Sequence, residues 1–267
     1  MPKRVPLVAL LTDFGLRDHY VGVVKAVLLS QCPSVQIIDI THDVQPQNIE
    51  QGAYLLWAAY RYLPVGAVIT AVVDPGVGTS RGIILAEADG RLFLGPDNGV
   101  LDFVLWEEKV HEVTVIRMDH PATRSILPQK ISGTFHGRDV FAPLSAHLAD
   151  GGNAEDLGKK VPVDWVESPF VDKFNPEGRP RVLHVDRFGN IITNIKGDED
   201  RVPFEFRGLR LGSRRIYRWI ENYESAPSDV PCLLVGSNGL IEIVMRNTTA
   251  AAALNADELT PLRIQQH

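Results

Sequence analysis

Three short apolar runs alternate with two amphipathic segments in the N-terminal part of the chain. The apolar runs, Val5–Leu11, Val35–Ile40 and Ala67–Val73, are rich in branched aliphatic residues, which is typical of buried strands. The intervening segments, Asp18–Cys32 and Asn48–Leu63, repeat their apolar side chains at helical spacing. A strand-helix-strand-helix-strand order with continuously apolar strands predicts a mostly parallel sheet that is covered by helices on both faces.

Turn and cap residues mark further boundaries in the same region. The dipeptide Asp89-Gly90 separates Gly82–Ala88 from Arg91–Leu94, which is a strong signal for a β-hairpin. Asp18 and Asp139 each stand just before a segment with apolar periodicity, and an aspartate in that position favours a helix N-cap. We therefore expect a hairpin at residues 82–94 and helices that are capped by Asp18 and Asp139.

The later part of the chain changes character after a stretch that lacks periodicity. Residues 166–180 are dense in proline and charge, which is typical of a linker. Short strand-like runs separated by turns follow, and they predict a smaller all-β domain, a sandwich or a barrel. With 267 residues, the chain is long enough for two unequal domains. We expect an N-terminal α/β domain at residues 1–165, a linker at 166–180 and a C-terminal β domain at 181–267.

The charge and the cysteine content argue against several classes of protein. The 27 Lys and Arg against 33 Asp and Glu give a formal net charge of −6, whereas nucleic-acid binding needs a basic surface. Cys32 and Cys232 are the only cysteines, so neither a disulfide framework nor a cysteine zinc site is indicated. The apolar run Val5–Leu11 is too short for a signal peptide or a membrane span. We expect a cytoplasmic protein with no nucleic-acid and no membrane partner.

Acidic side chains follow all three predicted strands: Asp13, Asp43 beside His42, and Asp74. The carboxyl ends of strands in an open α/β sheet are where such folds bind their ligands. One chemistry for this cluster is a divalent metal that activates water, as in a nucleotide phosphohydrolase that uses Asp13, Asp43 and Asp74. Another is an organic ligand that the acids orient, with one acid positioning a nucleophile. Ordinary turn and cap roles are a third interpretation.

The segment Asp74-Pro75-Gly76-Val77-Gly78-Thr79-Ser80-Arg81 is the most distinctive of these strand ends. A glycine-rich turn after a buried strand lets the backbone approach a ligand closely. His136 stands in a second loop that carries glycine and arginine, just before a predicted helix. The sequence has no Walker motif, no G-x-G-x-x-G after the first strand, no His-Glu-x-x-His and no G-x-S-x-G elbow. Common nucleotide, zinc-protease and serine-hydrolase signatures are therefore absent.

Taken in order, these and further stretches resemble one known family, the S-adenosylmethionine (SAM) hydrolases. They are also called SAM hydroxide adenosyltransferases and are relatives of the SAM-dependent fluorinases and chlorinases. The matching stretches are collinear and span nearly the whole chain, and their joint occurrence is highly specific. They are Thr12-Asp13-Phe14-Gly15 with Asp18, Val73–Thr79 with Arg81, Gly95-Pro96-Asp97-Asn98-Gly99, Phe135-His136-Gly137-Arg138-Asp139, Asp186-Arg187-Phe188-Gly189-Asn190 with Thr193-Asn194, and Gly236-Ser237-Asn238-Gly239 with Glu242.

The resemblance implies an activity and an assembly. In this family water attacks the ribose C5′ of SAM and releases adenosine and L-methionine. SAM is then the substrate rather than a cofactor, no cofactor is needed, and neither a metal nor a halide takes part. The resemblance further implies an N-terminal α/β domain, a C-terminal β domain, and a homotrimer with active sites at subunit interfaces.

The resemblance also assigns the catalytic residues. An Asp-Arg-His triad handles the water in the hydrolases, and it maps onto Asp74, Arg81 and His136. The halogenases have an aromatic residue where Asp74 stands, so this chain resembles the hydrolase branch. We expect Asp74 to orient and deprotonate the water, while Arg81 and His136 position it and stabilise the charge that develops on its oxygen.

The family pattern assigns substrate contacts as well. Asp13 is assigned to the ribose hydroxyls, and Asp18 and Asp186 are placed near the methionine amino group. Adenine is assigned to Asn190, Ser237 and Glu242, with Phe188 packed beside it. A carboxylate suits the first two tasks because it accepts hydrogen bonds from hydroxyls and from an ammonium group.

Two positions depart from the halogenase pattern. Asn238 stands where the halogenases have an arginine, and Gln47 is nearest to a tryptophan that lies beside their adenosine. The methionine carboxylate is thus left without an obvious cationic partner. An altered or stereochemically unusual sulfonium is therefore an alternative substrate. The metal-dependent nucleotide phosphohydrolase and a non-catalytic module that binds adenosine or SAM are the alternative functions.

Overall fold

The computed structural model describes residues 5–170, 180–197, 207–258 and 260–265. By its internal contacts the chain divides into two units, Met1–Phe170 and Val171–His267, which are described separately below. Most of the predicted linker at 166–180 lies outside the described residues.

A seven-stranded sheet forms the centre of the first unit, in the order β2-β1-β3-β5-β4-β6-β7. Strands β1, β2, β3 and β5 are parallel to one another, β4 is antiparallel to both β5 and β6, and β7 is antiparallel to β6. Five of the seven strands therefore run in the same direction, and the predicted mostly parallel sheet is confirmed. The strands are β1 (Leu7–Thr12), β2 (Gln36–Thr41), β3 (Val68–Val72), β4 (Ile83–Ala88), β5 (Arg91–Pro96), β6 (Glu112–Ile116) and β7 (Gly158–Pro162).

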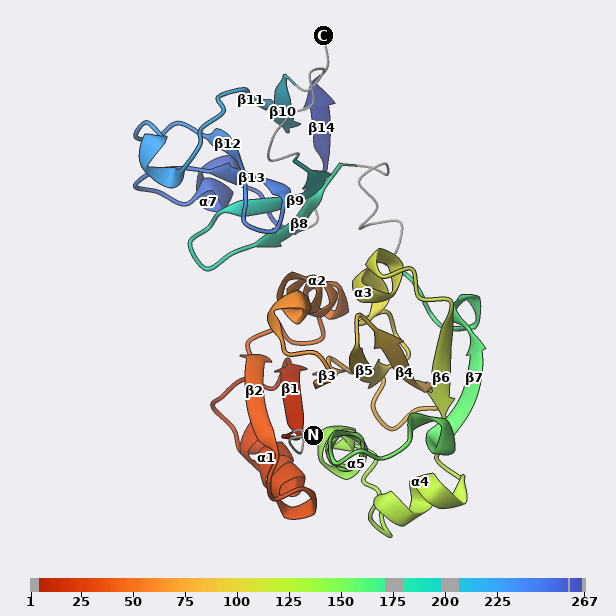
Figure 1. Cartoon of the computed structure of the whole chain (residues 1–267). Helices are drawn as coiled ribbons and strands as arrows, with labels where there is room; N and C mark the ends of the chain where they lie inside the picture. The colour runs from red at the N-terminus through yellow and green to blue at the C-terminus, as the bar shows by residue number, and fades with distance from the viewer. Residues whose placement is uncertain (1–4, 171–179, 198–206, 259, 266–267) are drawn as a thin grey trace. The chain divides into compact units, whose positions relative to one another are not determined.

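Helices cover both faces of this sheet, as Figure 1 shows. Side chains of β1 alternate between the two faces, because successive strand residues point in opposite directions. Val8 and Leu10 join the cluster formed with helices α1 and α5, whereas Leu11 packs toward Gly52 of α2 on the other face. The helical segments are α1 (Tyr20–Gln31), α2 (Ile49–Ala59), α3 (Asp102–Glu107), α4 (Pro121–Ile126), α5 (Ala142–Ala149), the π-helix η2 (Gly137–Phe141) and the 3-10 helices η1 (Tyr60–Tyr62), η3 (Ala154–Leu157) and η4 (Val163–Trp165). None of the helices in the described part of the chain is both long and apolar enough to cross a membrane.

Both predicted aspartate caps are wrong. His19, not Asp18, occupies the N-cap position of α1, and no side chain caps that helix. The helical segment near Asp139 already begins at Gly137 as the π-helix η2. The Asp139 carboxylate is not at the helix start, and it accepts a hydrogen bond from the backbone nitrogen of Ser132 at 2.8 Å instead. Both aspartates stand near a helix start, but tertiary contacts decide which residue occupies the cap position.

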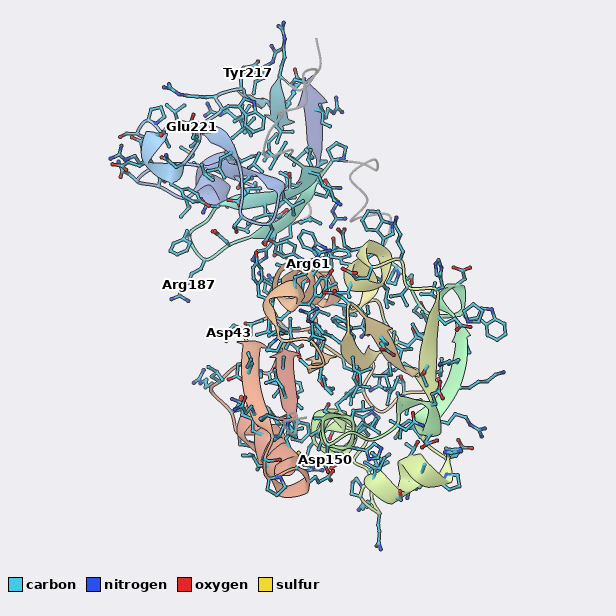
Figure 2. All side chains as sticks on the ribbon, in the orientation of Figure 1. Asp43, Arg61, Asp150, Arg187, Tyr217 and Glu221 are labelled. Atoms are coloured by element: carbon cyan, nitrogen blue, oxygen red, sulfur yellow. The ribbon has the colours of Figure 1, made fainter. Side chains whose placement is uncertain are left out.

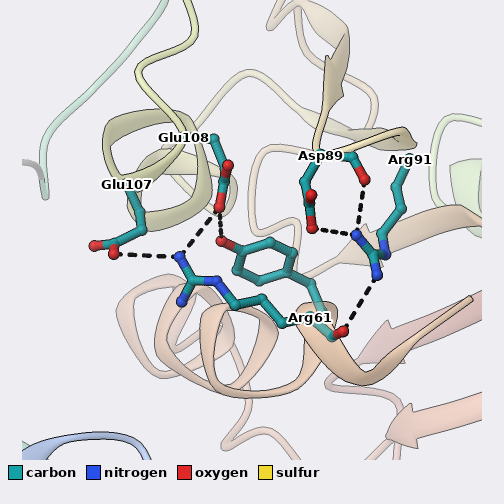
Figure 3. A network of polar contacts seen from close by, with 6 residues as sticks. Arg61, Asp89, Arg91, Glu107 and Glu108 are labelled. Atoms are coloured by element: carbon teal, nitrogen blue, oxygen red, sulfur yellow. Dashed lines mark hydrogen bonds and ion pairs between the residues drawn. The ribbon is translucent and has the colours of Figure 1, made fainter. Parts of the chain in front are cut away.

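The predicted hairpin is confirmed, and its turn belongs to a polar network (Figure 3). Asp89 and Gly90 both have positive φ angles, 47° and 68°, as a two-residue hairpin turn requires. Arg91 is only 5% exposed and donates to the carbonyl oxygens of Leu63 at 2.9 Å and Arg61 at 3.2 Å. Arg61 in turn donates to Glu107 at the end of α3 and to Glu108, which caps that helix. The network thus ties the β4–β5 hairpin and α3 to the end of α2.

The second unit is built from two antiparallel sheets. Their orders are β12-β13-β9-β8 and β11-β10-β14. Ile191 and Ile243 of the first sheet share one apolar cluster with Leu209 and Leu262 of the second. The predicted all-β character is confirmed, and two separate sheets around one core correspond to the sandwich alternative. The elements are β8 (Val182–Val185), β9 (Ile191–Lys196), β10 (Gly208–Leu211), β11 (Arg214–Ile216), β12 (Cys232–Val235), β13 (Leu240–Val244), β14 (Leu262–Gln265), η5 (Tyr223–Ser225) and α7 (Ala250–Leu254).

A buried carboxyl group at the start of α3 makes the stability of the first unit depend on pH. Asp102 is 1% exposed, it accepts a hydrogen bond from the backbone nitrogen of Phe170 at 2.9 Å, and burial raises its pKa to about 7. Between pH 3.8 and about pH 7, the folded chain therefore keeps the proton on Asp102, whereas an unfolded chain, with an ordinary aspartate pKa of 3.8, has released it. The stabilisation is fully present below pH 3.8 and is lost as the pH rises through about 7.

Between about pH 5.5 and about pH 8, we expect the free energy of unfolding of the unsubstituted chain to fall by on the order of 2 kcal/mol relative to that of Asp102→Asn. Its melting temperature should fall accordingly. Thermal melts at several pH values measure this difference. Asp164→Asn, the same change at an exposed position, is the matched control. A gap between Asp102→Asn and the unsubstituted chain that stays constant with pH would contradict the assignment.

Candidate active site

The first candidate residues lie at the point where the sheet reverses its strand order. The chain leaves β1 through α1 to reach β2, then passes through α2 to β3 on the other side of β1. Open α/β sheets bind ligands at such a point, beyond the carboxyl ends of the two strands. Asp13 follows β1 directly, and Asp74 follows β3 with only Val73 between. The crevice between β1 and β3 therefore has an acidic side chain on each side.

The Asp74–Arg81 loop folds back on itself and pairs its two ends. Backbone hydrogen bonds from Val77 to Asp74 and from Thr79 to Gly76 form consecutive turns, at 3.2 and 3.1 Å. Arg81 Nε then donates to both carboxylate oxygens of Asp74, at 3.0 and 3.1 Å, and Nη2 forms an ion pair with Oδ2. The two side chains are only 4% and 11% exposed. The loop thus holds a buried, bidentate ion pair.

His136 extends this pair into a chain of three side chains. Arg81 Nη2 lies 2.9 Å from Nδ1 of His136. Because a guanidinium group can only donate, Nδ1 must accept, and the ring proton is then on Nε2. Burial and the positive charge of Arg81 both lower the pKa of His136, which favours this neutral form. The site therefore presents a carboxylate and an imidazole N–H that are both held by one arginine.

Asp13 is fixed by the loop that precedes α2. Its Oδ2 accepts a hydrogen bond from the backbone nitrogen of Gln47 at 2.8 Å, and Gln47 has a positive φ of 66°. Burial raises the pKa of Asp13, the bond from Gln47 lowers it, and the nearby negative charge of Asp74 raises it further. Asp13 is therefore close enough to Asp74 for the negative charge of one to act on the other.

Three aromatic rings connect the Asp13 loop with the His136 loop. Phe14, Tyr20 and Phe135 pack edge to face, with ring centroids 5.2 to 6.1 Å apart. Gly137 fits against Phe14, since an added Cβ would lie 3.0 Å from that ring. Asp18, by contrast, lies in the exposed segment before α1, outside the hydrogen-bonded group of Asp74, Arg81 and His136.

The metal-site interpretation required Asp43 to join Asp13 and Asp74. Asp43 is exposed just beyond the carboxyl end of β2, where Figure 2 labels it. Asp74 is already occupied by the Arg81 guanidinium. Within residues 5–170, 180–197, 207–258 and 260–265, no three His, Cys, Asp or Glu side chains are grouped to hold a metal ion.

In the second unit, Asp186 and Asn190 hold the β8–β9 turn together. Asp186 accepts hydrogen bonds from the backbone nitrogens of Phe188 and Asn190, at 2.9 and 2.8 Å, and from the Asn190 side chain at 2.9 Å. Gly189 supplies the positive φ of 81° that the turn needs. These contacts leave Phe188 78% exposed at the tip of the turn. Asp186 and Asn190 therefore have a structural task in addition to any contact with a ligand.

Glu242 of β13 lies close to this turn. Its Oε2 accepts a hydrogen bond from the Tyr223 hydroxyl at 2.9 Å. Burial raises the pKa of Glu242, and the negative charge of Asp186 raises it further. Ser237 lies exposed in the β12–β13 turn next to Gly236, whose missing Cβ leaves room for the Glu242 carboxylate. Asp186, Asn190 and Glu242 thus form a second polar group within their own unit.

Two participating residues were not predicted from the sequence. Tyr223 holds Glu242, but it stands in a short 3-10 helix with no periodic pattern to single it out. Gln47 was noted only as a departure from the halogenases, whereas its backbone nitrogen fixes Asp13. Its position two residues before the α2 segment carried no signal for the positive φ.

Comparison with known proteins identifies the family. The family model of the SAM hydroxide adenosyltransferase N-terminal domain matches residues 8–158, and the model of the corresponding C-terminal domain matches residues 180–263. The chain therefore belongs to the SAM hydroxide adenosyltransferase family, and the resemblance seen in the sequence is confirmed.

Individual relatives agree with this assignment. The chain is 40% identical over 258 residues to an (R)-S-adenosyl-L-methionine hydrolase of Thermus thermophilus, covering 95% of this chain and 97% of the relative. It is 28% identical over 241 residues to a fluorinase of Nocardia brasiliensis, covering 79% of this chain and 77% of the relative. The crystal structure of an uncharacterized conserved protein from Thermotoga maritima superposes with a TM-score of 0.84 at 32% identity, covering 97% of this chain and all of that one.

Proposed function

We propose that the chain hydrolyses (R)-S-adenosyl-L-methionine by water attack at the ribose C5′, giving adenosine and L-methionine. The observation that carries this proposal is the hydrogen-bonded series Asp74–Arg81–His136, which begins just beyond the carboxyl end of β3 and contains a buried ion pair. The Thermus thermophilus relative is an (R)-S-adenosyl-L-methionine hydrolase, which supports the choice of substrate and of the sulfonium stereoisomer. An (R) sulfonium is also consistent with the alternative of a stereochemically unusual substrate, which was raised by Asn238 in place of the arginine of the halogenases.

In this mechanism a water molecule between Asp74 and the substrate forms the new bond. Its oxygen attacks C5′ as the bond from C5′ to sulfur breaks, and the electron pair of that bond converts the sulfonium into the neutral thioether of methionine. The leaving group needs no acid, because it departs uncharged. Asp74 takes the proton of the water, and its Oδ1 retains acceptor capacity beside Arg81 Nε. Adenosine then carries the former water oxygen as its 5′-hydroxyl.

Arg81 and His136 position the reacting groups and stabilise charge. Arg81 locks the Asp74 carboxylate by two donors and saturates Nδ1 of His136. The remaining Nε2–H of His136 donates to the oxygen on which negative charge develops. A neutral imidazole donates there without repelling the sulfonium substrate, and the lowered pKa of His136 supports that state. The reaction neutralises a sulfonium and a carboxylate, which a site closed to water favours.

The other residues assigned by the family pattern fit this proposal as binding groups. Asp13, which follows the strand next to the one that precedes Asp74, binds the ribose hydroxyls. Asp18 and Asp186 contact the methionine amino group, and the adenine contacts Asn190, Ser237, Glu242 and Phe188. Catalysis needs no cofactor, metal or halide. The family resemblance further supports a cytoplasmic homotrimer with active sites at its subunit interfaces, and the two buried free cysteines fit a reducing compartment.

Separate incubations with the (R) and (S) sulfonium epimers of SAM test the proposal. The expected result in EDTA, without halide, is adenosine and methionine in equal amounts, with kcat/KM at least about 10-fold higher for the (R) epimer. In H₂¹⁸O the label should enter the 5′-hydroxyl of adenosine. Binding of either epimer without product would instead support a binding module. If the chain releases phosphate from nucleotides and EDTA abolishes that release, the metal-dependent phosphohydrolase is supported instead.

A further inference from the structure

One family stretch has no part in the proposed chemistry or substrate binding. The turn Gly95-Pro96-Asp97-Asn98-Gly99 begins with the last two residues of β5, the strand beside β3, so it lies at the same edge of the sheet as Asp74. The Asn98 side chain and the Asp97 backbone nitrogen bond to Val73 and Gly82, the residues on either side of the Asp74–Arg81 loop. The contacts suggest that this turn acts on the catalytic residues through the backbone that carries them.

The first contact is on the peptide just before Asp74. The Asn98 side chain donates from Nδ2 to the carbonyl oxygen of Val73 at 2.9 Å. Its Oδ1 accepts from the backbone nitrogen of Val100 at 3.2 Å, which fixes the orientation of the amide. The β1–β3 pairing ends at Val72, so Asn98 takes the place of a strand neighbour for the next, fully buried residue.

The second contact is on the residue just after Arg81. The backbone nitrogen of Asp97 donates to the carbonyl oxygen of Gly82 at 3.0 Å. Packing here is tight, since a Cβ added at Gly82 would lie 3.2 Å from both Cβ and Oδ2 of Asp97. The Gly95–Gly99 turn therefore fixes both the entry and the exit of the catalytic loop.

We propose that Asn98 is a positioning residue for the reaction, which holds the Asp74 carboxylate in line with the attacked carbon by fixing the Val73 carbonyl. The adjacent backbone of Asp97 does the same for Arg81 through Gly82. This inference rests on the proposed hydrolase function. A displacement of about 1 Å in a reacting group can cost on the order of 100-fold in rate, although no contact with substrate is lost.

The test is Asn98→Asp, which keeps the size and the acceptor toward Val100 but replaces the donor toward Val73 by an oxygen. We expect kcat on (R)-SAM to fall about 10- to 100-fold, while KM and the Kd for adenosine stay within about twofold. The matched control is Asn153→Asp, since Asn153 uses only an oxygen, accepting from the backbone nitrogen of Glu155. A carboxylate there preserves that bond and should leave kcat unchanged.

Two results would overturn the inference. One is a kcat of Asn98→Asp within about threefold of the control, and the other is a loss in kcat/KM that comes entirely from a rise in KM, with a matching rise in the Kd for adenosine. If Asn98→Asp does not fold at the assay temperature, Gly82→Ala serves instead, because it only crowds Asp97 at the other end of the loop. It should lower kcat with KM unchanged, and a normal kcat would overturn the inference. Absence of turnover in the unsubstituted chain would instead refute the proposed function.

Discussion

Asp74→Asn is expected to lower turnover of (R)-SAM by at least about 10³-fold, because the amide cannot take the proton of the attacking water. Adenosine should still bind with nearly the same Kd, since Asn keeps the size of the side chain and the ribose contact is assigned to Asp13. The measurements are a discontinuous assay for adenosine and a calorimetric titration of the variant with adenosine. Turnover within about 10-fold of the unsubstituted chain would exclude Asp74 as the base.

The same substitution should also lower stability. Arg81 is 11% exposed and would be left without its counter-charge, and breaking a buried ion pair costs about 3 kcal/mol. Thermal melts must therefore accompany the kinetics, and the assay temperature must lie below the transition of the variant. Asp164→Asn, at an exposed position of the same unit, controls for the change in net charge. Equal stability of both variants would show that the Asp74–Arg81 pair adds little to the fold.

Gly78→Ala is expected to destabilise the chain by on the order of 3 kcal/mol and to lower turnover at the same time. Gly78 has a φ of 78°, a conformation that L-residues rarely adopt, and an added Cβ would lie 2.0 Å from the carbonyl oxygen of Gly133. Gly133 begins the loop that carries His136, so the new methyl group must push the Arg81 and His136 loops apart. Melting temperature and kcat of the purified variant measure the two effects.

Gly133→Ala is the matched control for this prediction. It changes the other member of the same contact, but its Cβ would meet no atom within 4 Å. Melting temperature and kcat should therefore stay close to those of the unsubstituted chain. If Gly78→Ala and Gly133→Ala behave alike, close packing between the two loops is not what brings His136 to Arg81.

The sequence predicts the framework of the site well because that framework follows from strand polarity. Parallel strands place their carboxyl ends at one edge of a sheet, so acidic residues after β1 and β3 had to meet there. The hairpin at Asp89-Gly90 was predictable for a similar reason, because its turn chemistry is local. Strand polarity and hairpin-turn chemistry were thus sufficient for these two features, whereas the local rule for helix caps failed at Asp18 and Asp139.

The residues that complete the site follow no such rule. Asn98 and Val73 are joined by a hydrogen bond across 25 positions of the chain, and Arg81 and His136 across 55. No periodicity encodes these contacts. The positive φ of Gln47 and the cap positions near Asp18 and Asp139 depend likewise on tertiary packing. For His136 the family resemblance, and not the residue pattern, supplied the partner.

Asp74, to which we assign the role of base, and Arg81, which holds it, are seven residues apart in a single loop. Asp13, to which we assign the ribose, comes from a different strand and is fixed by a different segment. The residues assigned to the nucleophile and the residue assigned to the ribose therefore lie in separate segments of the chain. An exchange of residues 74–81 for the corresponding loop of a relative would therefore alter the proposed water-activating pair while leaving the proposed ribose contact in place, provided that the contacts to His136 and to the Gly95–Gly99 turn are kept.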